Sequence, residues 1–274
     1  MKKKLLITMG CSFTEGVGCY DPSTIPSDMV DRMKHPKVEE VYINNKKRFH
    51  EFSWPSHLQK LINYDALINL GFGGSSTSGN VKVWFEKYYD KNFTDEFDVL
   101  LIWLLPAPSR FSFYRSGSIM NINPALNKNV YNVHSYDLGK EYAKFIDDVE
   151  LDPILEQIFY LKVMEEHFKS KKFNFLYSTF DSERHKFFEK LHNSEFRMVF
   201  EENLFPNFEK HPEMKSLICD HPNELGYKYI SEQIFNWIQK NKPELISTSE
   251  PNEYNSIWDG YPIFDHLQKF RTLI

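Results

Sequence analysis

The sequence predicts an α/β fold with a doubly wound, mostly parallel sheet flanked by helices. Short apolar runs of strand length alternate along the chain with longer segments of helical periodicity. The strongest run, Phe97–Leu105, is apolar at successive positions, which is typical of a strand buried on both faces of a parallel sheet. Polar turns, several of them rich in glycine, follow the predicted strands.

Strands and helices are expected in alternation as far as residue 240. The predicted strands are short runs that end at glycine, proline or polar residues, and they lie at residues 4–9, 66–70, 97–105 and 174–178. Helices are predicted where apolar residues recur at helical spacing, at residues 53–64, 81–89, 153–169 and 226–240, with a further helix within 183–200.

This pattern predicts one domain over residues 1–240 that carries two insertions. The first insertion, near 20–50, combines several prolines with mixed charges and is expected to be an irregular surface excursion. The second, near 109–150, lacks periodicity and is expected to form a lid or a substrate wall. Residues 241–274 are expected to be an extension docked on the domain or on a neighbouring subunit, which leaves the oligomeric state open.

Charge and cysteine content exclude several classes of protein. The chain has 33 basic and 38 acidic residues and a net charge of -5, without a long basic run, so we expect no nucleic-acid partner. The three cysteines match no zinc-binding spacing and are an odd number, which favours a reducing compartment. No metal and no organic cofactor is indicated.

The apolar run at the N-terminus is predicted to be a strand and not a signal sequence. Residues 5–9 follow three lysines, but the run is about half of the shortest usual hydrophobic core of a signal peptide. No segment approaches the ~18 apolar residues of a membrane span. We therefore expect a cytoplasmic protein that does not associate with membranes.

Two polar loops carry residues with catalytic potential. Ser12 comes shortly after the first predicted strand, and His221 precedes the last predicted helix. A serine hydroxyl needs a base within hydrogen-bond distance to act as a nucleophile. Each residue alone is more often structural, the serine as a helix cap. Because loops at the carboxyl ends of parallel strands converge, the two together favour a serine nucleophile with a histidine base.

Three motifs in order resemble those of the SGNH (GDSL-like) hydrolases. Residues 10–16 (GCSFTEG) resemble the first block, and residues 69–77 (NLGFGGSST) resemble the block with the oxyanion glycine, which falls on Gly74. Residues 220–226 (DHPNELG) resemble the histidine block. The resemblance spans about residues 5–240 and implies a flavodoxin-like fold. It also implies Ser12 as nucleophile, His221 as base, and the N–H groups of Ser12 and Gly74 as oxyanion donors.

The chain departs from this family's pattern at two places. The third block usually supplies an asparagine, whereas here residues 102–110 (IWLLPAPSR) contain none. Ser109 or Arg110 is a candidate for substrate binding there, with Arg110 able to hold a carboxylate or phosphate, although a surface ion pair is the more common role. The family's aspartate would fall on Ile218. Asp220 is adjacent to His221 instead and is kept as a candidate acid, with a dyad as the alternative.

Several hypotheses on function stay open. The resemblance implies an esterase or deacetylase that acts on a small ester, such as an acetyl group on a carbohydrate. A transferase with the same covalent intermediate is an alternative. The missing asparagine and the displaced aspartate favour another, a non-catalytic scaffold for binding or structure, for example in a phage-encoded protein. Cys11 is an alternative nucleophile beside Ser12.

Overall fold

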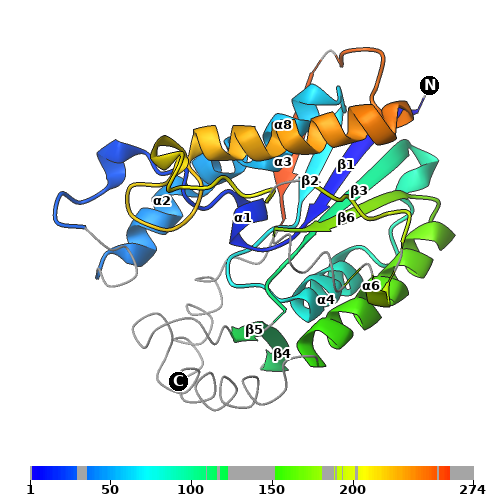
Figure 1. Ribbon diagram of the computed structural model, residues 1–274, viewed down its shortest axis with the longest axis horizontal. Coiled ribbons are helices and arrows are strands. Elements are labelled where there is room, and N and C mark those ends of the chain that lie inside the picture. Colours follow the sequence, from blue (N-terminus) through cyan, green and yellow to red (C-terminus); the bar gives the residue numbers. More distant parts are fainter. Residues whose placement is uncertain are drawn as a thin grey trace.

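The computed structural model describes residues 2–29, 36–108, 110–115, 118–122, 152–180, 188, 190–192, 194–200, 203–251 and 253–259. A five-stranded parallel sheet lies at its centre, with the strand order β6-β3-β1-β2-β7 (Figure 1). The strands are β1 (Lys3–Met9), β2 (Ala66–Asn69), β3 (Phe97–Leu105), β6 (Asn174–Thr179) and β7 (Asn255–Trp258). The predicted parallel sheet flanked by helices is confirmed.

Helices cover both faces of this sheet. The helices α3 (Trp54–Leu61) and α8 (Glu224–Asn241) pack on one face, and α4 (Thr77–Lys87) and α6 (Asp152–Ser170) pack on the other (Figure 1). Short 3-10 helices lie at Pro22–Thr24, Phe93–Asp95, Pro212–Met214 and Pro243–Leu245. The sheet therefore forms the middle layer of three.

Side-chain alternation along the strands divides the core into two layers. Leu6 and Leu100 face α3 and α8, whereas Leu5 and Leu101 face α4 and α6. All four side chains are buried, and Leu6 lies in register with Leu100 between β1 and β3. Because both faces are covered, the strands are apolar at nearly every position, which is the pattern that the sequence showed.

The strand order reverses between β1 and β3. The chain moves from β1 to β2 on one side, then returns across β1 to β3 and continues to β6. At such a switch point the loops that leave the two neighbouring strands diverge, and a crevice opens at the carboxyl ends. Ser12 lies in the loop and short helix that follow β1, at this point of the sheet.

The prediction of an irregular segment at 20–50 is wrong for its second half. Residues Val38–Glu51 form helix α2, which buries a face made by Val41, Tyr42, Asn45 and Phe49. The polar Asn45 belongs to this face because its amide side chain bonds Thr24 and the Val41 carbonyl. A buried polar residue and many surface charges thus hid the helical periodicity.

Two other segments differ in detail from the prediction. Residues 188, 190 and 191 are helical, but residues 195 and 196 lie in a turn. Arg197 then forms an isolated parallel bridge with Tyr177 of β6, which bonds Phe196 and Met198 through the backbone. In the second insertion, β4 (Phe111–Arg115) and β5 (Ser118–Ile122) pair in antiparallel orientation. Residues 123–150, the remainder of the predicted lid, lie outside the described residues, and that prediction stays a prediction.

The extension after residue 240 contributes the edge strand β7. Asn255–Trp258 pairs in parallel with β2, and the Trp258 indole donates a hydrogen bond of 2.8 Å to the Gly71 carbonyl. Asp259 accepts from Lys87 at 2.5 Å and also bonds the Tyr88 hydroxyl. The tail thus contacts the chain at two places, just after β2 at Gly71 and at the end of α4 at Lys87 and Tyr88.

Among the described residues, none of the helices has the length and apolar character that crossing a membrane requires.

Replacement of Trp258 tests the attachment of the tail. Trp258→Phe removes the indole donor and leaves the Gly71 carbonyl without it, so we expect the free energy of unfolding to fall by about 1–2 kcal/mol in urea denaturation. Tyr254→Phe is the control, since the hydroxyl of Tyr254 makes a longer bond of 3.3 Å to Asn63 near the surface. Its effect should stay below about 0.5 kcal/mol. Equal effects of both substitutions would contradict this role of Trp258.

Candidate functional site

A one-turn helix presents Ser12 at the carboxyl end of β1. Helix α1 spans Ser12–Glu15, and the Cys11 carbonyl accepts hydrogen bonds from the Thr14 and Glu15 N–H groups at 2.9 and 3.0 Å. Gly10 allows the tight passage from strand to helix, because a Cβ there would lie 2.0 Å from Oγ1 of Thr14. Ser12 is therefore fixed by backbone geometry at a point where the sheet ends.

The loop before α8 presents His221. The Ser216 N–H donates to the His221 carbonyl at 2.9 Å, and the Asn223 N–H donates to the Met214 carbonyl at 2.9 Å. Asn223 also caps α8, since its side chain accepts from the Gly226 N–H at 3.2 Å. The cap and the loop bonds hold the histidine at the start of the helix.

The structure brings Ser12 and His221 together. Oγ of Ser12 lies 2.8 Å from Nε2 of His221, which is hydrogen-bond distance across 209 positions of the sequence. Ser12 is 6% exposed, and Nδ1 of His221 is shielded from solvent. The ring of Phe13 packs against the imidazole with 4.8 Å between ring centroids. This is the contact that a base needs to take the serine proton.

Tyr227 joins the histidine helix to the serine turn. Its hydroxyl donates to the Val17 carbonyl at 2.7 Å and lies 3.5 Å from the Ser12 carbonyl. Burial raises the pKa of Tyr227 well above its ordinary value, so the hydroxyl keeps its proton and remains a donor. Gly18 makes the two loops meet closely, because a Cβ there would lie 2.1 Å from the Pro222 carbonyl oxygen.

Asp220 does not face the imidazole, contrary to its candidacy as the acid. Its carboxylate lies 2.6 Å from the Lys215 ammonium, and its side chain is 91% exposed. Asp220 lies in a bend of the loop, and its carboxylate reaches solvent instead of Nδ1 of His221. The aspartate of a Ser-His-Asp triad is not supplied by Asp220.

The glycine-rich loop after β2 is tied to the serine turn. The Gly10 carbonyl accepts hydrogen bonds from the Ser75 hydroxyl at 2.9 Å and from the Asn80 amide at 3.0 Å. Gly74, directly before Ser75, has a positive φ of 74°, a conformation that favours glycine. Asn69 adds a third tie, because its amide donates to the Thr14 carbonyl at 2.8 Å. The loop with Gly74 therefore lies beside the residues that lead into Ser12.

Of the remaining candidates, Arg110 lies next to this loop. Its Nη1 is 3.4 Å from the Ser75 carbonyl oxygen. Ser109 lies outside the described residues. Cys11, the alternative nucleophile, is buried at 1% exposure and caps α1 through its backbone.

Sequence reasoning missed the residues that hold the site together. Tyr227 directly follows the histidine motif, and the sequence pattern does not distinguish it from the other buried positions of α8. Asn80 lies beyond the motif of the glycine-rich loop, and its side-chain oxygen accepts from the Trp103 indole at 2.9 Å. Its position so close to the glycine-rich loop is the feature of the sequence that could have indicated buried side-chain hydrogen bonds.

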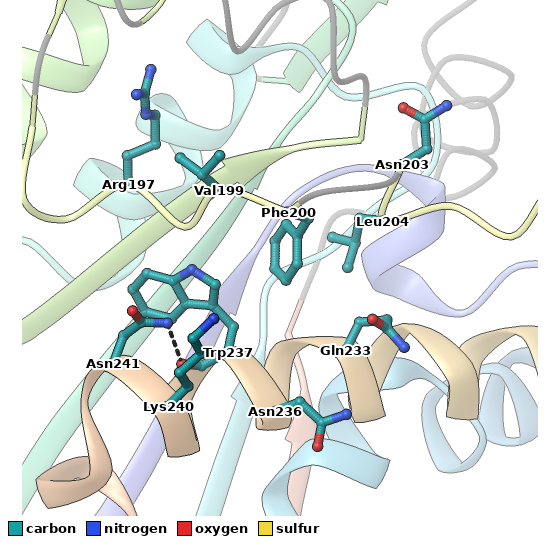
Figure 2. A pocket seen from close by; sticks show the side chains of 10 residues that line it. All are labelled: Arg197, Val199, Phe200, Asn203, Leu204, Gln233, Asn236, Trp237, Lys240 and Asn241. Carbon is teal, nitrogen blue, oxygen red and sulfur yellow. Dashed lines mark hydrogen bonds between the residues drawn. The ribbon is translucent and has the colours of Figure 1, made fainter.

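A separate cavity of about 650 Å³ lies between α8 and the segment after β6 (Figure 2). Trp237 projects from α8, while Phe200 and Leu204 come from the facing segment (Figure 2). Its described lining does not include Ser12 or His221. Phe205, next to Leu204 in the sequence, packs against Phe13 with 4.7 Å between ring centroids.

Within the part of the chain that the structure describes, no three His, Cys, Asp or Glu side chains are grouped to hold a metal ion.

Neither protein-family profiles nor curated protein sequences match this chain. Among solved structures, it is similar to one described as "The active site of a carbohydrate esterase displays divergent catalytic and non-catalytic binding functions". The sequence identity is 14% and the TM-score is 0.46, over 89% of this chain and 67% of that chain. A likeness of this degree leaves the chemistry of the site to be argued from its geometry.

Substitution of the cap residue tests how the histidine loop is held. Asn223→Ala removes the acceptor of the Gly226 N–H and the donor to the Lys215 carbonyl, so unfolding free energy should fall by about 1–2 kcal/mol in urea denaturation. Asn241→Ala, at the other end of α8, is the matched control because its amide donates to the Trp237 carbonyl one turn earlier, at the surface. It should change stability by less than about 0.5 kcal/mol. If Asn223→Ala were as stable as Asn241→Ala, the role of Asn223 in holding the histidine loop would be refuted.

Proposed function

We propose that this protein is a serine esterase with Ser12 as nucleophile and His221 as base. The observation that carries the proposal is the 2.8 Å distance between Oγ of Ser12 and Nε2 of His221, at the switch point of the sheet. A serine hydroxyl is a weak nucleophile until a base takes its proton, and this contact supplies the base. The second support is that backbone hydrogen bonds fix both the serine turn and the histidine loop, which limits the entropy lost in reaching the reactive geometry.

The proposed reaction proceeds through an acyl-enzyme. Oγ of Ser12 attacks the ester carbonyl carbon while Nε2 of His221 accepts the hydroxyl proton. The tetrahedral intermediate collapses, the bond to the alcohol breaks, and the imidazolium returns the proton to the leaving oxygen. Water then attacks the acyl-Ser12 carbonyl with His221 again as base, which releases the carboxylic acid and restores the serine.

The N–H groups of Ser12 and Gly74 are the proposed donors to the oxyanion. Support comes from the Ser75 bond to the Gly10 carbonyl, which holds the residue after Gly74 beside the serine turn. Backbone donors fixed before the reaction need no reorganisation as charge develops, and each is typically worth about 3 kcal/mol. Without the family asparagine, the site relies on fewer donors, so we expect a modest turnover number.

In this proposal the catalytic unit is the Ser12–His221 pair without Asp220. The exposed carboxylate beside Lys215 cannot orient the imidazole. Packing of the Phe13 ring and the backbone bond from Ser216 restrain His221 instead. The substrate class that the sequence resemblance favours is a small ester, such as an acetyl group on a carbohydrate. Transfer to a second alcohol would use the same intermediate, and product analysis distinguishes it from hydrolysis.

Hydrolysis of p-nitrophenyl acetate tests the proposal. Ser12→Ala should lower kcat/KM by about 1,000-fold or more, because the covalent path is lost. Cys11→Ser should retain most of the activity, since Cys11 contributes to α1 through its backbone carbonyl. Loss of activity in Cys11→Ser with retention in Ser12→Ala would assign the nucleophile to the cysteine.

A second control uses the exposed acid. Asp220→Asn should stay within a few-fold of the unmodified protein, whereas the aspartate of a working triad costs about 10,000-fold. Folded wild-type protein that hydrolyses no ester would favour a binding role on this scaffold.

A further inference from the structure

The guanidinium of Arg110 lies at the edge of the candidate site, next to the glycine-rich loop. Among the described residues no carboxylate pairs with Arg110, so the surface ion pair expected from sequence alone is not formed there. Its Nη1 makes one long contact of 3.4 Å with the Ser75 carbonyl, and its Nε is shielded from solvent without a hydrogen-bond partner. A partly desolvated cation without an acid is electrostatically uncompensated.

Two hydrogen bonds restrain the chain between the end of β3 and Arg110. The Arg110 N–H closes the turn on the Ala107 carbonyl at 3.1 Å. The buried amide of Gln157, on α6, donates to the Pro106 carbonyl at 3.0 Å and to the Thr77 hydroxyl at 2.7 Å. The Gln157 bonds join Pro106, directly after β3 and four residues before Arg110, to α6 and α4.

The Arg110 cation lies beside the proposed oxyanion loop. Ser75, which Arg110 contacts, directly follows Gly74, and its hydroxyl bonds the Gly10 carbonyl two residues before Ser12. The last residues of β3 border the same turn, since a Cβ on Gly10 would lie 3.0 Å from the Leu104 carbonyl oxygen. These contacts connect Arg110 to the serine turn through Ser75, which makes a molecule with both an anionic group and an ester the ligand to consider.

We infer that Arg110 binds an anionic group of the substrate, so that the site prefers esters that carry a carboxylate. This inference rests on the proposed esterase function and names its substrate class. A guanidinium recognises a carboxylate by charge-assisted hydrogen bonds in a planar geometry. The substrate anion supplies the counterion that the described residues do not, and it orients the ester toward the serine.

Matched ester pairs test this inference. The first pair is 4-acetoxybenzoate and its methyl ester, with the charge on the alcohol side. The second is mono(4-nitrophenyl) adipate and 4-nitrophenyl hexanoate, with the charge on the acyl side. The measured quantity is the ratio of kcat/KM for the anionic ester to that for the neutral ester. Comparing this ratio between variants cancels the intrinsic reactivity of each ester.

Arg110→Gln should lower the ratio about tenfold or more for at least one pair, while kcat/KM for the neutral ester changes little. Arg110→Lys should give an intermediate ratio, because it keeps the charge but loses the planar donor set. Lys215→Gln is the matched control, since it removes a cation beside the His221 loop and leaves Arg110 intact. Its ratio should stay close to that of the unmodified protein.

The possible failures are distinguishable. Equal loss of activity toward both members of each pair, or a ratio that Arg110→Gln leaves unchanged, overturns the role of Arg110 and leaves the esterase proposal standing. If Lys215→Gln lowers the ratio as much as Arg110→Gln does, the role of Arg110 is also overturned, because the preference for anionic esters would then come from general electrostatic attraction. Wild-type protein that hydrolyses none of the four esters overturns the esterase proposal and this inference together.

Discussion

The hydrogen bond from the Tyr227 hydroxyl to the Val17 carbonyl connects the two regions of the chain on which the site depends. Tyr227 lies in the first turn of α8, and Val17 directly follows the residues that end α1. Because the hydroxyl is fully buried and its pKa is raised, the bond is not exchanged for water or lost by ionisation. Docking of α8 at this point brings the histidine loop against the serine turn. The two meet so closely at Gly18 that a side chain at this position would collide with the Pro222 carbonyl.

A second set of buried bonds performs the same task on the other side of Ser12. The Gly10 carbonyl accepts from Ser75 and Asn80, so the glycine-rich loop cannot move independently of the serine turn. The tail strand reinforces that loop through Trp258 and the Gly71 carbonyl. The site is thus assembled at the switch point by polar contacts between loops that are distant in sequence, while apolar burial of the strands supplies the rigid base.

The sheet and most of its helices were predictable from the sequence because apolar burial leaves a local pattern. The run in β3 and the periodicity of α8 are examples. The Ser12 and His221 loops were predictable only as a combination of motifs, since neither residue stands out alone. Helix α2 was missed because Asn45 interrupts its apolar face, and the direction of Asp220 depends on Lys215, five residues away, which no periodicity encodes. Tertiary hydrogen bonds such as that of Tyr227 leave no local signal.

The central claim is that Ser12 is a nucleophile activated by His221, and covalent labelling tests it most directly. Folded protein treated with a fluorophosphonate should gain one adduct by intact-mass spectrometry, with peptide mapping assigning it to Ser12. The adduct should form much more slowly in His221→Ala, since the base that activates the serine is removed. No adduct on folded wild-type protein, or labelling at equal rates with and without His221, would contradict the account.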